Sequence, residues 1–253
     1  MFSAGALCIG TSAFADTEAL PSLCSDLSGP LPFPPQTLVF SRTRGALLGC
    51  ITEDVLSEVY RRLDLPVRFV ETPGLRSLQL SSMGHFAGET LRISGLTRKY
   101  PDLLQVDPPV AYMKSAAFVR RNSWVRIEKP DDLHRYTIAY LDGIVSAKRL
   151  GQYARKAMPM PTRAHALRAL ENGDVDAVIM GQISGQIASQ RGGFRNISPE
   201  PVVLQTTSVH HYIHRKHAHL IPRVSAELAA LKASGEANAL FMSRAKELIH
   251  LGS

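Results

Sequence analysis

Short apolar runs alternate with longer amphipathic stretches over the first hundred residues, and this pattern predicts an alternation of strands and helices. Strands are expected at 37–41, 66–71 and 86–94, where apolar and β-branched residues cluster. Between them, 51–63 and 75–82 carry apolar residues at helical spacing. Such alternation is typical of a mostly parallel sheet flanked by helices, so the sequence predicts an α/β fold.

The alternation breaks at 97–125, where two prolines separate two extended stretches. The second stretch, 112–119, predicts a strand that crosses between two parts of the molecule. An extended return segment is expected at 201–216, followed by an amphipathic helix at 221–235. Between the two crossings we expect strands at 137–143, 158–162 and 174–180, and helices at 146–157, 163–173 and 183–193.

Hydroxyl side chains stand at the starts of two predicted helices. Thr52 opens the helix at 51–63, and Ser146 opens the helix at 146–157. A hydroxyl at such a position accepts a hydrogen bond from a free backbone N–H. We therefore predict Thr52 as a cap, and for Ser146 capping is the alternative to a ligand contact.

Composition and charge narrow the function classes. The chain has 253 residues, of which 45% are hydrophobic and 20% charged, as in an ordinary globular protein. A net charge of +7 favours anionic partners. No basic stripe interleaves with aromatic residues, which argues against nucleic acid as a partner. No apolar run approaches the roughly 20 residues of a membrane span, so we do not expect the chain to cross a membrane.

The first fifteen residues have the character of an export signal. Residues 1–15 are small, apolar and uncharged, and they end in an A-x-A sequence, after which Asp16 would begin the mature protein. The positive start of a complete signal peptide is missing, and a disordered apolar tail is the alternative. We expect a periplasmic protein with an irregular, proline-rich segment at 16–36.

Cysteine usage agrees with export. Cys8 would leave with the signal, so that Cys24 and Cys50 remain. In an oxidising compartment an even pair favours a disulfide, and closing this loop would stabilise the fold by about 3 kcal/mol. Two unrelated thiols are the alternative.

Five stretches, taken in order, resemble one protein family. They are FAGETLRISG, KYPDLLQV, EKPDDLHRYTIAYLDG, HALRALENGDVDAVIM and YIHRKHAHLIPRVSAELAALKASGEANAL. Together they resemble bacterial extracellular solute-binding proteins of the type 2 periplasmic-binding fold, close to the amino-acid-binding family 3. The resemblance extends over more than 200 residues, about four fifths of the chain.

This resemblance implies two α/β lobes joined by two extended hinge segments, with a ligand held in the cleft between them. It places lobe 1 at 37–114 plus 210–253 and lobe 2 at 115–209. It further implies a monomer that binds a small molecule and passes it to an ABC importer or a membrane receptor.

Lobe 1 offers five candidate ligand contacts. Arg92 matches an arginine of the family, and its planar fork can donate two parallel hydrogen bonds to a carboxylate. Glu89 stands three residues earlier, so a regular strand would place the two side chains on opposite faces. Arg42 and Thr43 follow the first strand, and Tyr112 could form an aromatic wall. The alternatives are a salt bridge for Arg92, a solvated loop for Arg42 and Thr43, and hinge packing for Tyr112.

Lobe 2 offers candidates in two turns that connect a strand to a helix. Asp142, Gly143 and Ser146 lie in the first turn, where glycine allows the backbone to approach a ligand. Gly181 and Gln182 lie in the second turn.

Two positions depart from the amino-acid-binding pattern. Amino-acid-binding members of the family carry an aspartate near the second of these turns, and this chain has Gly181 and Gln182 instead. The first-motif aspartate of the family is replaced by Ala87. Both changes argue against an α-amino acid and, with the basic charge, favour an anionic or carboxylate-bearing ligand.

Catalytic motifs are missing. The sequence has no G-x-S-x-G, no H-E-x-x-H and no phosphate-binding glycine loop, so we expect neither enzymatic activity nor a cofactor. The fold itself also supports a periplasmic enzyme, for example one resembling a dehydratase, which is the alternative function.

A histidine-rich stretch, HHYIHRKHAHL at 210–220, suggests a metal site at first sight. On a strand, however, His210 and His214 lie about 13 Å apart, too far to share one ion. His217 and His219 could supply two ligands, yet no cysteine or carboxylate lies within seven residues. A metal-binding protein is therefore the weaker alternative. We expect these histidines to pack near the hinge, where their protonation could influence lobe closure.

Overall fold

The computed structural model describes residues 36–250. The predicted signal peptide at 1–15, the irregular segment up to residue 35 and Cys24 lie outside the described residues. Within the described part, no helix combines the length and apolar character that a membrane crossing requires.

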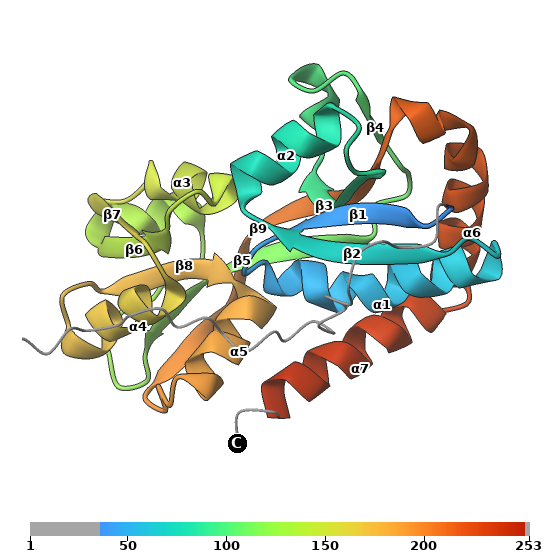
Figure 1. Ribbon diagram of the computed structural model, residues 1–253. Helices are drawn as coiled ribbons and strands as arrows, with labels where there is room; N and C mark the ends of the chain where they lie inside the picture. Colours follow the sequence, from blue (N-terminus) through green and yellow to red (C-terminus); the bar gives the residue numbers. More distant parts are fainter. Residues whose placement is uncertain (1–35, 251–253) are drawn as a thin grey trace, which may run out of the picture.

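The first half of lobe 1 is a parallel α/β unit (Figure 1). Its elements are β1 (Leu38–Thr43), α1 (Leu47–Arg62), β2 (Val67–Thr72), α2 (Gly74–Ser82) and β3 (Gly88–Ile93). Strand β1 lies in the middle and pairs in parallel with both β2 and β3. The predicted alternation is therefore confirmed for this part of the chain.

Two long strands connect the lobes. β5 (Ala111–Arg120) and β9 (Ile197–His214) pair antiparallel over most of the length of β5. The short strand β4 (Leu103–Gln105) pairs with the end of β9. The described strands form one sheet in the order β2-β1-β3-β9-β5-β8-β6-β7, so β5 and β9 are the shared centre of the molecule. These two strands are the crossing and return segments that the sequence predicts.

Lobe 2 repeats the parallel α/β arrangement on the other side of β5. Strand β6 pairs in parallel with both β7 and β8. The elements are β6 (Thr137–Leu141), α3 (Val145–Gly151), β7 (Lys156–Met160), α4 (Arg163–Asn172), β8 (Ala177–Gly181) and α5 (Gln182–Arg191). Short 3-10 turns occur at η1 (Leu96–Arg98), η2 (Pro130–Arg135) and η3 (Arg215–Leu220).

Each lobe has its own core. One core joins β1, α1 and α6 (Ile221–Ala233) through residues such as Phe40, Leu56 and Leu228. Two further cores cover the two faces of the lobe 2 sheet. The predicted lobe boundaries, at 114/115 and 209/210, fall inside β5 and β9, and they stay a prediction.

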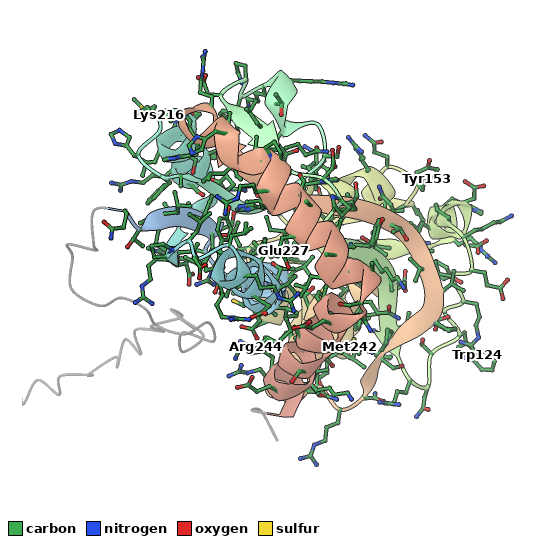
Figure 2. All side chains as sticks on the ribbon, turned by 90° about the vertical axis from the view of Figure 1, so that its right-hand side faces the viewer. Trp124, Tyr153, Lys216, Glu227, Met242 and Arg244 are labelled. Atoms are coloured by element: carbon green, nitrogen blue, oxygen red, sulfur yellow. The ribbon has the colours of Figure 1, made fainter. Side chains whose placement is uncertain are left out.

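The second C-terminal helix, α7 (Glu236–His250), was not predicted, and it packs on both lobes. Figure 2 shows α6 and α7 following one another across one side of the molecule. Arg244 of α7 forms a bidentate ion pair with Asp54 of α1, with both N–O distances 2.9 Å. A small buried cluster joins α1, α5 and α7 through Leu47, Ile51, Ile187, Ala245 and Leu248.

Two helix boundaries differ from the predictions. α1 begins at Leu47 rather than 51, and Thr52 is no cap, because it is buried and its hydroxyl donates to the carbonyls of Leu48 and Gly49. α3 ends at Gly151, because the residues from Lys156 pair with β6 as strand β7. In both cases tertiary contacts outweigh the local pattern.

Candidate functional site

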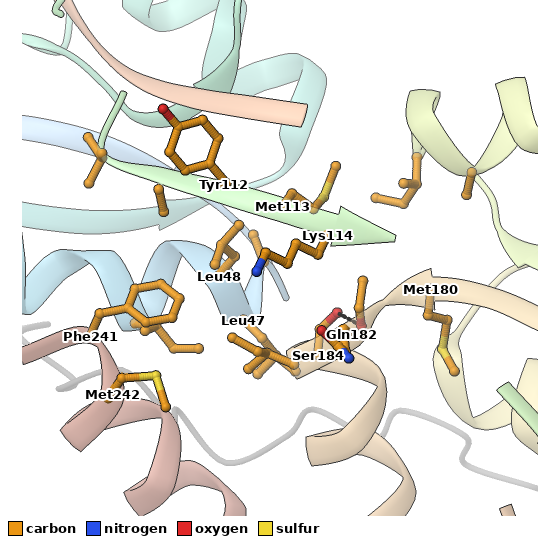
Figure 3. A pocket seen from close by; sticks show the side chains of 18 of the residues that line it. Leu47, Leu48, Tyr112, Met113, Lys114, Met180, Gln182, Ser184, Phe241 and Met242 are labelled. Atoms are coloured by element: carbon orange, nitrogen blue, oxygen red, sulfur yellow. Dashed lines mark hydrogen bonds between the residues drawn. The ribbon is translucent and has the colours of Figure 1, made fainter. Parts of the chain in front are cut away.

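A cavity of about 620 Å³ lies between the lobes. It is enclosed by the first turn of α1, the start of β5, the ends of β6 and β8, the start of α5 and one face of α7. Its volume falls in the range typical of small-molecule sites, about 300–1,000 Å³. Figure 3 shows side chains of α1, β5, α5 and α7 around the same space.

The walls of the cavity are mostly apolar. Leu47 and Leu48 come from α1, Ile183 from α5, and Phe241 and Met242 from α7. Helix α5 reaches this position because Gly185 lets it approach β5 closely. A Cβ at Gly185 would lie 2.2 Å from the Phe118 ring.

Three cations line the cavity: Lys114 from β5, Arg163 from the start of α4, and Lys232 from α6. In Figure 3, Lys114 reaches from β5 toward the first turn of α1. Among the described residues that line the cavity, none is Asp or Glu. The site is therefore apolar and positively charged.

Arg163 contacts lobe 1 through a hydrogen bond to the backbone and not through an ion pair with a described residue. Its guanidinium donates a hydrogen bond to the carbonyl of Gly45, at 3.2 Å across the two lobes. No described acidic residue forms an ion pair with it. Burial lowers the pKa of Arg163, because nothing nearby compensates for the lost hydration of the charge.

Lys232 contacts the residues at the start of the connecting strand β5. Its ammonium donates to the carbonyl of Pro109 at 2.5 Å and lies 5.5 Å from the centre of the Tyr112 ring. Burial lowers the pKa of Lys232 as well. Lys114 is exposed and makes no ion pair among the described residues.

Two helix N-termini also face the cavity. The residues Ala46–Leu48 at the start of α1 and 181–184 at the start of α5 are part of its lining. Neither helix has a side chain that caps its first turn, and neither has an acidic residue there. In the first turn of α1, the N–H groups of Leu47 and Gly49 donate to the carbonyls of Gly45 and Ala46. Both helix starts nevertheless present the partial positive charge of a helix dipole.

Of the predicted site residues, Tyr112, Gly181 and Gln182 line this cavity. The turn that carries Asp142 and Gly143 is adjacent to it.

The lining side chains of that turn are instead Leu141, Ile144 and Ala147. Asp142 accepts a hydrogen bond from the N–H of Gly143, at 2.9 Å. Ser146 does not cap α3, whose N-cap is Ile144, and its buried hydroxyl has no hydrogen-bond partner.

The predicted contacts at the end of β1, Arg42 and Thr43, are not among the residues that line the cavity. Arg42 is buried and pairs with Glu53 at 2.5 Å and with Glu71 at 3.4 Å, and it donates to the sulfur of Cys50 at 3.0 Å. Burial raises the pKa of Glu53 to about 7, against the opposing effect of Arg42. Thr43 is partly buried at the end of β1. As ligand contacts, Arg42 and Thr43 stay predictions.

Glu89 and Arg92 bond to each other, although a regular strand would separate them. The pairing of β3 with β9 shifts register between the two residues, and this irregularity brings both side chains to the same side. Arg92 donates to Glu89 at 2.7 Å and to the carbonyl of Gly74 at 3.3 Å. Glu89 is fully buried and also accepts from Ser77 and Ser81.

The histidines of the stretch 210–220 are divided between two places. His210, His211 and His214 are buried in lobe 1. His217 and His219 border a separate hollow of about 410 Å³ at the far end of the lobe, near the N-terminal end of β1. Among residues 36–250, no group of three or more potential ligands is arranged to hold a metal ion.

His211 has both ring nitrogens occupied. One lies 2.8 Å from the Tyr60 hydroxyl and the other 3.2 Å from the carbonyl of Thr90. Burial lowers the pKa of His211 to about 4. This histidine is a neutral part of the lobe 1 core.

Cys50 is disulfide-bonded. Its predicted partner, Cys24, lies outside the described residues, so the pairing stays a prediction.

Sequence reasoning missed the three cavity cations and α7. One signal was available for Lys114, which interrupts the apolar run AYMKSAAFV of β5. Arg163 and Lys232 are indistinguishable in sequence from other helical cations, because only the fold places them at the cavity.

Comparisons with known proteins support the fold. No family model matches the chain. A protein of Shewanella oneidensis, described as uncharacterized, is 24% identical over 173 residues. The alignment covers 64% of this chain and 64% of that protein, so the match spans a little under two thirds of the relative.

Solved structures share the architecture over most of the chain. A GluR0 ligand-binding core in complex with L-glutamate has a TM-score of 0.69 at 10% identity, covering 82% of this chain and 97% of its own. A histidine kinase sensor domain with similarity to periplasmic binding proteins has a TM-score of 0.63 at 18% identity, covering 82% and 95%. The substrate-binding protein of an amino acid ABC transporter has a TM-score of 0.60 at 15% identity, covering 81% and 96%. The two-lobed type 2 periplasmic-binding fold predicted from the sequence is confirmed.

Proposed function

We propose that this chain, which has the type 2 periplasmic-binding fold, is an exported solute-binding protein that captures a small anionic molecule between its lobes. The observation that carries the proposal is the inter-lobe cavity of about 620 Å³, lined by three cations and by no described acidic residue. An anion entering it would gain charge pairing that the protein itself does not supply.

The captured solute would then be delivered to an ABC importer or presented to a membrane receptor. The two outcomes correspond to two of the similar structures, a transporter's substrate-binding protein and a kinase sensor domain. A periplasmic enzyme on the same fold is the competing function.

Ligand capture is tested by mass spectrometry of small molecules that copurify with the protein, followed by thermal-shift screening of acidic metabolites. A true ligand raises the melting temperature by mass action. A matched pair of α7 variants locates the binding: Asn238→Trp fills the cavity, whereas Ala239→Trp alters an exposed neighbour outside the lining.

We expect Asn238→Trp to abolish the shift and Ala239→Trp to retain it. If both variants bind as the wild type does, the inter-lobe cavity is not the site. Consumption of the ligand over hours, with appearance of a product, would favour the enzyme.

A further inference from the structure

We propose that the ligand is an amphipathic organic monocarboxylate, with an extended apolar body and no ammonium group. This inference rests on the proposed function and narrows it to a chemical class. It is carried by three features of the cavity: its apolar walls, its cations without carboxylate partners, and a described lining without a carboxylate that would pair with an ammonium ion.

The apolar walls of the cavity favour a ligand with an apolar body. Residues from seven elements face the space with aliphatic, thioether or aromatic side chains, among them Leu48, Met113, Ile179, Phe241 and Met242. A small polar anion would leave most of this surface in contact with water or empty. An apolar body would remove that surface from water, which is favourable in proportion to the area covered.

The three cations of the lining favour a ligand with an acidic head group. Arg163 lines the cavity and donates to the carbonyl of Gly45, and its remaining donors have no carboxylate partner among the described residues. Lys114 projects from the strand that forms the roof of the cavity in Figure 3. An arginine with free donors is suited to a carboxylate, which it can bind through two parallel hydrogen bonds.

The start of α1 supports the same position for the head. Arg163 bonds to Gly45, which is adjacent to Ala46, the N-cap of α1. The uncapped first turn therefore lies directly beside the guanidinium. A carboxylate at this junction would meet an arginine and the positive end of the α1 dipole together.

The described lining, which has no acidic residue, disfavours a ligand with an ammonium group. An α-amino acid would bring a cation into a cavity that already contains Lys114, Arg163 and Lys232, where the described lining offers no carboxylate to offset it. At the start of α5, the lining contains two neutral polar side chains, those of Gln182 and Ser184. They can hydrogen-bond but cannot neutralise a charge, so like-charge repulsion disfavours the amino acid.

The test uses four compounds with the same ten-carbon chain: decanoate, decan-1-ol, decylamine and 2-aminodecanoate. Binding to the full chain is measured by isothermal titration calorimetry below the critical micelle concentrations. We expect decanoate to bind most tightly and the two amines to bind least. Shortening the acid should weaken binding about fourfold for each methylene removed, until the apolar walls are no longer contacted.

Two substitutions on helix α4 test where the carboxylate head group of the ligand binds. Arg163→Gln removes the cavity guanidinium, and Arg168→Gln removes an exposed charge five residues later outside the lining. We expect Arg163→Gln to weaken decanoate roughly ten- to hundredfold and to leave decan-1-ol unchanged. Arg168→Gln should alter neither affinity.

The outcomes separate this inference from the proposed function. Binding of a short polar anion in the cavity, with no response to decanoate, overturns the ligand class and leaves solute capture standing. Equal affinity for decanoate and 2-aminodecanoate, or an Arg163→Gln variant that binds decanoate like the wild type, also overturns the class. If neither these compounds nor an acidic metabolite library binds, both proposals fail.

Discussion

Arg42 and Glu89, in the interior of lobe 1, have partners of opposite charge within the protein, whereas the cations around the inter-lobe cavity lack carboxylates among the described residues. Arg42 is neutralised by Glu53 and Glu71, and Glu89 is held by Arg92 and two serines. Arg163, by contrast, bonds to one backbone carbonyl. The comparison teaches that an arginine beside a strand end can be part of the scaffold or of a site, and that its partners decide which.

The largest test of this contrast is the stability of two arginine variants. Arg42→Met leaves Glu53 buried without its cation, and at pH 8 we expect a loss of about 3–5 kcal/mol in the free energy of unfolding. Arg163→Gln should change it by less than about 1 kcal/mol, because no buried partner is stranded. Urea denaturation measures both, and equal losses would show that the two arginines have the same structural role.

The second test is pH dependence, because two buried groups of lobe 1 act in opposite directions. The pKa of Glu53 is raised from 4.5 to about 7, so its contribution to stability is complete below pH 4.5 and is lost as the pH rises through 7. The pKa of His211 is lowered from 6.5 to about 4, so its contribution is complete above pH 6.5 and is lost as the pH falls through 4. Between pH 4.5 and 6.5 the two slopes should cancel.

Substitution separates the two slopes. Glu53→Gln should make stability rise with pH between 4.5 and 6.5, and His211→Gln should make it fall, each by up to about 3 kcal/mol over the full titration. Arg163→Gln serves as the control, because a change at the cavity should leave the wild-type profile intact. Parallel profiles for all variants would contradict the assignment of these groups.

The third test concerns Arg92, for which the sequence predicts a ligand contact and the structure shows an ion pair with Glu89. We expect Arg92→Ala to cost about 1–3 kcal/mol of stability, because buried Glu89 loses a donor. If Arg92 belongs to the lobe 1 network alone, ligand affinity should not change. A loss of affinity at unchanged melting temperature would assign Arg92 to the site instead.

The smallest effect is expected at the boundary between the two regions. Tyr112 is 53% exposed, and its ring lies against Lys232 at the edge of the cavity. Tyr112→Leu should remove a cation–π contact of about 0.5–1 kcal/mol, whereas Tyr112→Phe should retain most of it. A double-mutant cycle with Lys232→Met measures the coupling, and a value near zero would contradict the contact.

The sequence predicts the order of the strands and helices well, because apolar periodicity reflects which faces are buried. It locates the two crossing strands, β5 and β9, from the interruption of the pattern. It places Thr52 wrongly, since a hydroxyl inside a helix can donate back to earlier carbonyls as well as cap a helix start.

The candidate site is less predictable than the fold. Tyr112, Gly181 and Gln182 are found by their position beside strand ends and hinges. Arg163 and Lys232 are not, because their role depends on the absence of a nearby acid in three dimensions. The bond between Glu89 and Arg92 depends on an irregularity in strand pairing that has no clear sequence signal.

The position of α7 also has a consequence for the order in which the molecule is completed. This helix follows all the described strands, yet it supplies Phe241 and Met242 to the cavity and links α1 to α5. A chain emerges N-terminus first, so earlier segments can begin to fold before later ones appear. Both lobes can therefore assemble their sheets while the binding chamber still lacks a wall, and the protein becomes competent for its ligand only when α7 docks.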